Sequence, residues 1–322
     1  MTTVLVTGSC GYIGSSLSHT LLKRGYNVIG IDNLFYNQSH IPLLPFNLYD
    51  NSSAGDYLFV KADCNNWDEI KKYIYAADIV VPLHALVGAP LCAAKPKLAK
   101  KTNFKSIKQI VDKLGKLQRI CSPNSNSGYG TSEKICTEKS PINCLSLYAK
   151  TKYEAEQYIL NKHENSICFR LATAFGMSLR PRFDLLVNDL IYKAYYDKEI
   201  TVFDPNASRN FVHVDDICLG FVWAIENGGN QEVYNLGNDK ENRTKLELAE
   251  LINSHIPFKI KIGEGADPDC RDYRISSGKL KKAGFQARTP IRTAIDQFKE
   301  FFNYLPEKKK IREKILKYNR NI

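Results

Sequence analysis

Long apolar runs are missing from this sequence of 322 residues. None approaches the ~20 consecutive apolar residues that a membrane-spanning helix needs. Met1 leads directly into a short strand-like run instead of a secretion signal. We therefore expect a soluble protein with a cytoplasmic location and no membrane partner. With 43% hydrophobic residues, the chain can still build one large α/β unit or two domains that share a core.

Paired cysteine motifs are missing as well. The nine cysteines are odd in number, never have the C-x-x-C spacing, and mostly lie within expected strands or helices. We expect reduced thiols and no metal site. The sequence also has no internal repeat and no low-complexity tract.

Acidic residues are the minority: the sequence has 34 Asp and Glu but 45 Lys and Arg, which gives a net charge of +11. Residues 306–322 alone hold seven Lys or Arg and two Glu, so +5 of this excess lies in one tail. Its apolar residues predict a basic amphipathic helix, which is typically a solvated face or a partner contact. Because no groove-reading motif accompanies the charge, we expect no nucleic-acid binding.

Residues 3–14 carry the strongest signal that is present. They read T-V-L-V-T-G-S-C-G-Y-I-G, a short apolar run and a glycine-rich turn, and the apolar spacing of a helix follows as far as Gly25. Gly8, Gly11 and Gly14 permit a sharp bend, close approach of a pyrophosphate, and tight packing of helix on strand. The free N–H groups of the helix N-terminus would face the anion. A dinucleotide fits this turn.

An acidic residue follows at the right distance. A second expected strand, residues 27–31, ends in Asp32, 18 residues after Gly14. A carboxylate there accepts hydrogen bonds from the adenosine ribose and repels the 2′-phosphate of NADP, which normally requires an arginine. The sequence predicts NAD. The alternative is a glycine turn in some other α/β domain, with Asp32 as a strand-end cap.

Strands and helices then alternate. We expect strands at 57–62, 78–83, 118–121 and 166–171, and helices at 68–75, 98–114 and 147–162. This alternation predicts an α/β fold with a parallel, doubly wound sheet of the Rossmann class in residues 1–174. Beyond Ala172 the pattern becomes irregular, with a short strand at 201–203. We assign 175–209 and 239–322 mainly to a smaller substrate domain, while 210–238 return to the sheet with a helix at 215–226 and a strand at 232–236.

Polar loops at the carboxyl ends of these strands form the expected ligand edge. Asp63 follows the third strand and should meet the adenine. His84 lies where the fourth strand exits; a catalytic role is conceivable, but a packing or backbone-bonded role is the better interpretation. The fifth strand leads into the serine-rich segment 122–130, expected as a loop that reaches the reacting groups.

Tyr148 and Lys152 lie four residues apart on an expected helix and therefore share a face. A phenol with a reference pKa near ~10 is a poor base at neutral pH, but a neighbouring ammonium and a positive nicotinamide favour the phenolate. Tyr148 can then accept a hydroxyl proton, Lys152 can hold the nicotinamide ribose, and Ser125 can hydrogen-bond the reacting oxygen. Alone this spacing is an ordinary helix face. Behind a dinucleotide fold and a serine-rich loop it predicts catalysis.

Over nearly all of its length the sequence resembles the extended short-chain dehydrogenase/reductases that modify nucleotide sugars. The matching motifs are T-G-x-x-G-x-x-G at 7–14, Asp32-Asn33-Leu34, the serine-rich segment ending in Tyr129-Gly130, Tyr148 with Lys152, and residues 209–215. The resemblance implies hydride transfer to NAD from a sugar carbon, usually C4. It also implies a homodimer that forms through the helices 98–114 and 147–162.

The same resemblance implies contacts with both ligands. For NAD we expect Gly8, Gly11, Tyr12, Ile13, Gly14, Asp32, Asn33, Asp63, Cys64, Leu83, His84, Ala85, Asn103, Ser122, Tyr148 and Lys152. For the nucleotide sugar we expect Val87, Asn124, Ser125, Asn126, Thr173, Arg182, Asn188, Arg209 and Arg271. Two of these, Arg209 and Arg271, match the arginines that clamp the diphosphate.

Departures from the family pattern bear on the reaction. Family 4,6-dehydratases and decarboxylases have acidic residues just after the catalytic Ser or Thr, but this chain has Asn126, Ser127 and Gly128, which disfavours dehydration. Thr173 stands where many epimerases have Asn. Segments 86–92, 123–129 and 182–189 look closest to GDP-manno-heptose 4-dehydrogenases of bacterial capsule pathways.

Three hypotheses follow. The leading one is a 4-dehydrogenase that leaves a 4-keto sugar, with a keto acid as a candidate acceptor for the hydride. The alternative is a 4-epimerase, and a non-catalytic NAD-binding regulator is the remote third.

Overall fold

The structure is a computed structural model that describes residues 1–38, 55–264 and 271–305. The amphipathic helix predicted for residues 306–322 lies outside these ranges, as does most of the loop between residues 33 and 55. Within the described ranges, every helix is too short or too polar to cross a bilayer. These ranges also contain no cluster of His, Cys, Asp or Glu that could hold a metal ion.

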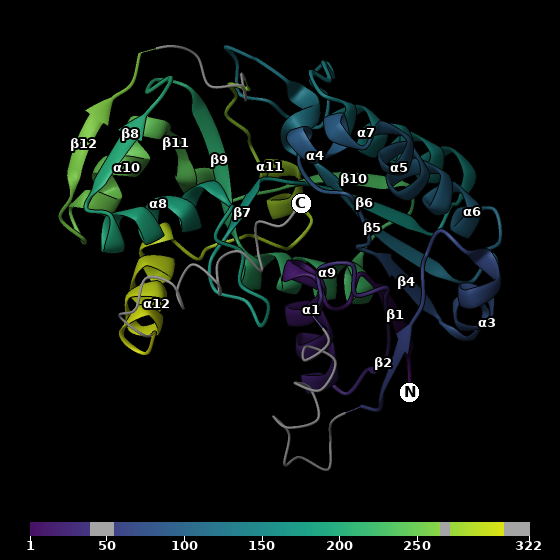
Figure 1. The fold of residues 1–322 in the computed structure, drawn as a ribbon. Helices are drawn as coiled ribbons and strands as arrows, with labels where there is room; N and C mark the ends of the chain where they lie inside the picture. Colours follow the sequence, from purple (N-terminus) through teal and green to yellow (C-terminus); the bar gives the residue numbers. More distant parts are fainter. Residues whose placement is uncertain (39–54, 265–270, 306–322) are drawn as a thin grey trace.

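Seven parallel strands form the larger sheet, in the order β10-β6-β5-β4-β1-β2-β3 (Figure 1). They are β1 (Thr3–Thr7), β2 (Asn27–Asp32), β3 (Tyr57–Lys61), β4 (Ile79–Pro82), β5 (Arg119–Ser125), β6 (Ser166–Leu171) and β10 (Glu232–Leu236). From β1 the chain extends the sheet first to β3 and then in the opposite direction, which confirms the doubly wound fold. Because all strands are parallel, the loops that follow them meet at one edge.

Helices cover both faces of this sheet (Figure 1). On one face α1 (Tyr12–Lys23) packs with α9 (Val214–Asn227). On the other face lie α3 (Trp67–Ala76), α6 (Ser106–Val111) and α7 (Leu147–Lys162). The apolar spacing explains the packing: Leu17 and Leu21 of α1 are four residues apart and fully buried, because this spacing places both on one side of the helix.

The long helix expected over 98–114 is interrupted. The structure has α4 (Ala89–Ala94), α5 (Pro96–Lys100), a π-helical turn (Lys101–Lys105) and then α6. The π-helical turn carries Asn103, whose amide hydrogen-bonds to both the N–H and the C=O of Leu86. A wide turn at such a contact is typical of a functional region of a helix, and the pattern of apolar residues does not reveal it.

Strand β5 is longer than expected and includes part of the segment assigned to a loop. Its pairing with β6 continues to Ser125, which lies opposite Leu171. Proline cannot donate a hydrogen bond to a neighbouring strand, so it is disfavoured in a strand that has neighbours on both sides. Pairing with β4 stops at Ile120, however, so Pro123 lies beyond the part of β5 that has strands on both sides. Ser125 is therefore the last residue of a strand, not part of a loop.

The smaller domain contains a three-stranded sheet, β11-β9-β7, and a two-stranded sheet, β12-β8. Its strands are β7 (Thr173–Phe175), β8 (Glu199–Val202), β9 (Ser208–His213), β11 (Asn242–Thr244) and β12 (Lys259–Ile262). Helices α8 (Leu186–Tyr196), α10 (Lys245–Asn253) and α12 (Ile291–Asn303) enclose its separate apolar core. Strand β9 belongs to the small sheet, and the helix α9 that follows it packs with α1 on the large sheet. A short helix, α11 (Gly278–Lys282), packs near β10.

Candidate active site

The glycine turn after β1 has no room for side chains. Gly8 has a φ of +68°, and a Cβ atom there would lie 2.8 Å from the backbone nitrogen of His84. A Cβ atom at Gly14 would lie 2.1 Å from the carbonyl oxygen of Gly8. Gly11 precedes α1, and among the described residues no side chain caps this helix. The N–H groups of Tyr12 and Ile13 therefore have no helical acceptor and can bind a pyrophosphate.

Asp32 lies beside this turn, at the end of β2, and is 8% exposed. Its carboxylate accepts hydrogen bonds from the backbone N–H of Cys10 at 3.0 Å and of Leu34 at 2.8 Å. Burial raises the pKa of this carboxyl, while the two N–H groups and the nearby Arg180 guanidinium oppose the shift. Two N–H bonds leave further lone pairs on the carboxylate for ribose hydroxyls. The turn and Asp32 thus fit the adenosine and pyrophosphate of NAD.

Replacement of Asp32 by alanine should weaken NAD binding about 10- to 100-fold, since charge-assisted bonds contribute about 1.5–3 kcal/mol. The preference for NAD over NADP should also relax, because no carboxylate then repels a 2′-phosphate. Titration of the protein with both cofactors measures this. Asp32→Asn is the control, since its amide oxygen can still accept from the turn. Equal binding of NAD and NADP by the unaltered protein would contradict the assignment.

The other predicted cofactor residues line the same sheet edge. Asp63 and Cys64 follow β3, and the Asp63 carboxylate orders its own loop by accepting from the N–H of Asn65 at 2.9 Å. Asn33, after β2, orders the next loop by accepting from the N–H of Phe35. The remaining predicted residues at this edge are Leu83 and Ala85, which follow β4, and Ser122, which is buried within β5.

His84 is a structural residue. Nε2 lies 2.8 Å from the Ser106 hydroxyl, which itself donates to the carbonyl of Thr102, so Nε2 carries the proton and donates to Ser106. Nδ1 then accepts from the Thr7 hydroxyl at 2.6 Å. Burial lowers the pKa of His84 to about 3, with a further contribution from Lys152. A neutral ring bonded at both nitrogens agrees with the predicted packing role, although its partners are side chains instead of backbone groups.

Tyr148 lies in the first turn of α7 near Ser125. Burial raises the pKa of the phenol to about 12, and the Cys92 thiol adds to the shift, whereas Arg271, Arg182 and the Ser125 hydroxyl lower it. These four neighbours of the phenol come from four different segments of the chain: Ser125, Cys92, Arg182 and Arg271. Their joint influence on one phenol shows that the fold brings them to the same site.

Lys152 lies one turn after Tyr148 and is only 4% exposed. Burial lowers the pKa of its ammonium to about 8, against the opposing effects of the Cys168 thiol, the Glu156 carboxylate and the Cys92 thiol. Among the residues that the structure describes, none hydrogen-bonds to this ammonium. This ammonium is therefore available to bind a ribose hydroxyl of the cofactor.

The Ser125 side chain is oriented to donate. Its hydroxyl oxygen accepts from the Ser127 N–H at 3.2 Å and lies 2.8 Å from the Ser127 hydroxyl, which donates to it. The proton of Ser125 is therefore available to a reacting oxygen. The pair Tyr148 and Ser125 can thus contact one hydroxyl group of a ligand from two sides.

Several predicted ligand contacts have structural roles in this geometry. Asn126 is 0% exposed, and its amide donates to Asn235 at 3.1 Å and to the Arg170 carbonyl at 3.0 Å. Asn188 is also 0% exposed, and it bonds to the backbone of Gly176 and Arg182. Both amides are already bonded within the protein, and the substrate contacts predicted for them stay predictions. Their polar patterns reflected long-range bonds that sequence spacing cannot show.

Two other predicted contacts hold loops in place. Asn103 fixes the Leu86 backbone and donates to the Thr151 hydroxyl of α7 at 3.3 Å, so it positions the loop that contains Val87, which is exposed. Arg182 forms an ion pair with Asp184. The remaining predicted substrate residue of this group, Thr173, begins β7 and is half-buried.

The segments that carry Arg209 and Arg271 are joined through the neighbouring residues Ser208, Asp272 and Tyr273. The N–H of Ser208 donates to the Asp272 carboxylate at 2.8 Å, and the N–H of Tyr273 donates to the Ser208 carbonyl at 3.1 Å. The guanidinium of Arg209 lies over the Tyr273 ring, 5.7 Å from its centroid, and the residue is 3% exposed. Arg209 is thus not a charge on the rim. Two guanidinium groups in adjacent segments suit a diphosphate.

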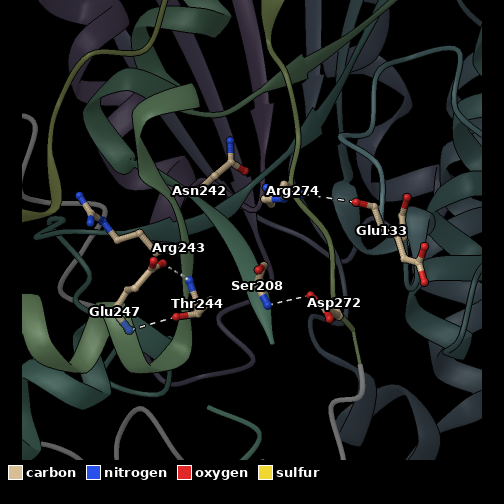
Figure 2. Close-up of a pocket in the computed structure, with 9 residues that line it drawn as sticks. Glu133, Ser208, Asn242, Arg243, Thr244, Glu247, Asp272 and Arg274 are labelled. Atoms are coloured by element: carbon tan, nitrogen blue, oxygen red, sulfur yellow. Dashed lines mark hydrogen bonds between the residues drawn. The ribbon is translucent and has the colours of Figure 1, made fainter. Parts of the chain in front are cut away.

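A cavity of about 300 Å³ adjoins this arginine pair (Figure 2). Figure 2 shows the Ser208–Asp272 contact inside it, with the start of α10 on one side and Glu133 on the other. Its lining consists of Ser132, Glu133, Ser208, Asn242, Arg243, Thr244, Glu247, Asp272 and Arg274. None of Ser125, Tyr148 and Lys152 lines this cavity, so it is separate from the reacting groups.

A buried polar network behind the site escaped the sequence interpretation. The Glu156 carboxylate accepts from the Asn124 amide and pairs with the Arg170 guanidinium at 2.8 Å. The sequence does contain a signal for this network. Glu156 lies four residues after Lys152, as Lys152 does after Tyr148, and this spacing places its carboxylate on the same face of α7.

These features define a dinucleotide-dependent enzyme: an open glycine turn, a carboxylate placed for a ribose, and the Tyr148–Lys152 pair, all at the carboxyl edge of a parallel sheet. Residues 4–237 match the NAD dependent epimerase/dehydratase family. The chain belongs to this family, and NAD is its cofactor, as predicted.

Relatives support the same assignment. An uncharacterized protein of Methanocaldococcus jannaschii is 29% identical over 321 residues, which cover 93% of this chain and 95% of that protein. The UDP-glucuronate 4-epimerase of Thermodesulfobacterium geofontis is 26% identical over 268 residues, which cover 80% and 81%. A solved structure, the UDP-glucuronic acid 4-epimerase of Bacillus cereus in complex with UDP-glucuronic acid and NAD, has a TM-score of 0.80 at 25% identity and covers 93% and 99%.

Proposed function

We propose that this enzyme oxidises the C4 hydroxyl of a nucleotide-activated sugar and leaves a 4-keto sugar. The observation that carries the proposal is the placement of Tyr148 and Lys152 in adjacent turns of α7, at the carboxyl edge of the sheet where Ser125 ends β5. Bound NAD supplies the hydride acceptor for such an oxidation. The protein supplies a base, a hydrogen-bond donor and positive charges.

Each residue then has a separate task. Tyr148 removes the proton of the sugar hydroxyl, and Ser125 donates a hydrogen bond to the same oxygen. Burial keeps the pKa of Tyr148 at about 12, so its role as a base requires added positive charge close by. Lys152, whose ammonium lacks a protein partner in the described residues, holds the cofactor ribose and adds that charge. Arg209 and Arg271 bind the diphosphate.

Two candidates follow for the nucleotide sugar and for the net reaction. The sequence segments that look closest to GDP-manno-heptose 4-dehydrogenases favour a GDP-heptose or a related hexose. The relative named UDP-glucuronate 4-epimerase favours the second candidate, a 4-epimerase acting on a UDP- or GDP-sugar. The two candidates differ in their need for an acceptor, because a net oxidation requires one and an inversion does not.

Incubation of the enzyme with candidate nucleotide sugars, with and without an added keto acid, separates these candidates. We expect a 4-keto product that accumulates beyond one equivalent per enzyme only when the keto acid is present. NMR of the products and stoichiometry of the reduced cofactor measure this. A C4-inverted sugar formed without any acceptor would refute the dehydrogenase and support the epimerase. No change of any nucleotide sugar would favour the non-catalytic regulator.

A further inference from the structure

The reacting groups come from two different elements of the fold. Ser125 ends β5, whereas Tyr148 and Lys152 lie on α7, so their separation depends on how the strand end sits against the helix. A side-chain bridge joins the two elements at this point. The amide nitrogen of Asn124 donates to the Glu156 carboxylate, and its amide oxygen accepts from the N–H of Ser125 at 2.8 Å.

The far end of the bridge is itself anchored. Glu156 is 1% exposed, and Arg170 of β6 donates from Nη2 to its Oε1 at 2.8 Å and from Nε to its Oε2 at 3.1 Å. Arg170 also donates to the Tyr129 hydroxyl at 3.0 Å, and this hydroxyl donates to Asn235 of β10 at 2.6 Å. A carboxylate held by several buried bonds cannot rotate freely. The Asn124 amide therefore has one orientation, and it fixes the backbone N–H of Ser125, to which it is bonded.

We propose that Asn124 and Glu156 are positioning residues that fix Ser125 relative to the Tyr148 phenol. The inference rests on the proposed function, because the placement of Ser125 matters only if it hydrogen-bonds the reacting oxygen. It also corrects the predicted substrate contact of Asn124, whose side chain is buried and bonded within the protein at both ends. A displacement of about 1 Å at a reacting group can cost about 10²-fold in rate, so loss of the bridge should act on kcat.

The first test is Asn124→Ala, which removes the bridge and leaves the Glu156–Arg170 ion pair intact, so no buried charge loses its partner. We expect kcat to fall about 10- to 100-fold, while KM for the nucleotide sugar and the affinity for NAD change by less than about twofold. Asn303→Ala is the matched control, because it removes an asparagine side chain that also bonds two elements, here α12 and Tyr195 of α8, away from this network. Its kcat should stay within about twofold of the unaltered enzyme.

A swap of the two polar groups tests the bridge directly. Asn124→Asp alone places two carboxylates against each other and should lower kcat. Combined with Glu156→Gln, it regains a donor and an acceptor across the bridge but gives Arg170 an amide in place of its carboxylate partner, so kcat should recover only in part. An unchanged kcat in Asn124→Ala, or an equal loss in Asn303→Ala, would overturn the proposal, as would a loss that appears only in KM.

Amide hydrogen exchange provides a readout that does not require turnover. Exchange at residues 125–127 should be faster in Asn124→Ala than in the unaltered protein and unchanged in Asn303→Ala. Unchanged exchange in Asn124→Ala would refute the bridge, whatever the activity. Faster exchange in a protein that oxidises no nucleotide sugar would support the bridge and count against the proposed function alone.

Discussion

Replacement of Tyr148 by phenylalanine is expected to lower kcat by about 10²- to 10⁴-fold, the usual contribution of a positioned general base. The variant keeps the ring and loses only the hydroxyl, so the packing of α7 should persist. NAD binding should also persist, because the glycine turn, Asp32 and Lys152 are untouched. Steady-state rates with the best nucleotide sugar, together with an NAD titration, measure both effects.

The pH dependence gives this prediction a second signature. Burial holds the phenol protonated at neutral pH, with a pKa of about 12, against the lowering influence of Arg271 and Arg182. A base must be deprotonated, so the rate of the unaltered enzyme should rise with pH until the phenol ionises in the complex. The Tyr148→Phe variant should lose this rise. Tyr153→Phe on the same helix is the control and should keep it. Turnover of Tyr148→Phe within about tenfold of the unaltered enzyme would remove Tyr148 from its role.

Replacement of Arg209 by lysine is expected to raise KM for the nucleotide sugar roughly 10- to 100-fold, which corresponds to one charge-assisted bond of about 1.5–3 kcal/mol. Lysine keeps the positive charge but loses the planar fork that forms two parallel bonds to phosphate oxygens. The structure sharpens this expectation, because Arg209 is buried and stacked on Tyr273 beside Arg271, where a flexible ammonium cannot reproduce its orientation.

The comparison must separate binding from folding. Arg292→Lys, an exposed arginine on α12, is the control and should leave KM unchanged. NAD affinity and thermal stability of Arg209→Lys should match those of the unaltered protein. If Arg209→Lys binds the nucleotide sugar normally but unfolds or loses NAD, then Arg209 is structural and the diphosphate must bind elsewhere.

Local patterns were sufficient to predict the local geometry of the glycine turn, of Asp32 and of the Tyr148–Lys152 pair. Glycines that permit a turn, a carboxylate at the end of the next strand, and two residues four apart on one helix are all consequences of short-range geometry. The structure places each of them as predicted, with Gly8 at positive φ, Asp32 beside the turn, and Tyr148 and Lys152 in adjacent turns of α7.

Predictions for polar residues that face the interior were less successful. Asn124, Asn126 and Asn188 were expected to contact the substrate, yet each hydrogen-bonds within the protein. An amide side chain looks the same in the sequence whether its partner is a ligand or a distant strand. The partner of Asn126, for example, is Asn235 on β10, and no local spacing reports that contact.

The sequence by itself determined the parallel α/β fold, the NAD turn and the Tyr148–Lys152 pair, because strand and helix periods and turn chemistry act over a few residues. Only the tertiary structure decided that β5 continues to Ser125, that Ser208 beside Arg209 bonds to Asp272 beside Arg271, and that Asn124 joins β5 to α7. These features depend on contacts between residues far apart in the chain, where burial makes each polar group require a particular partner.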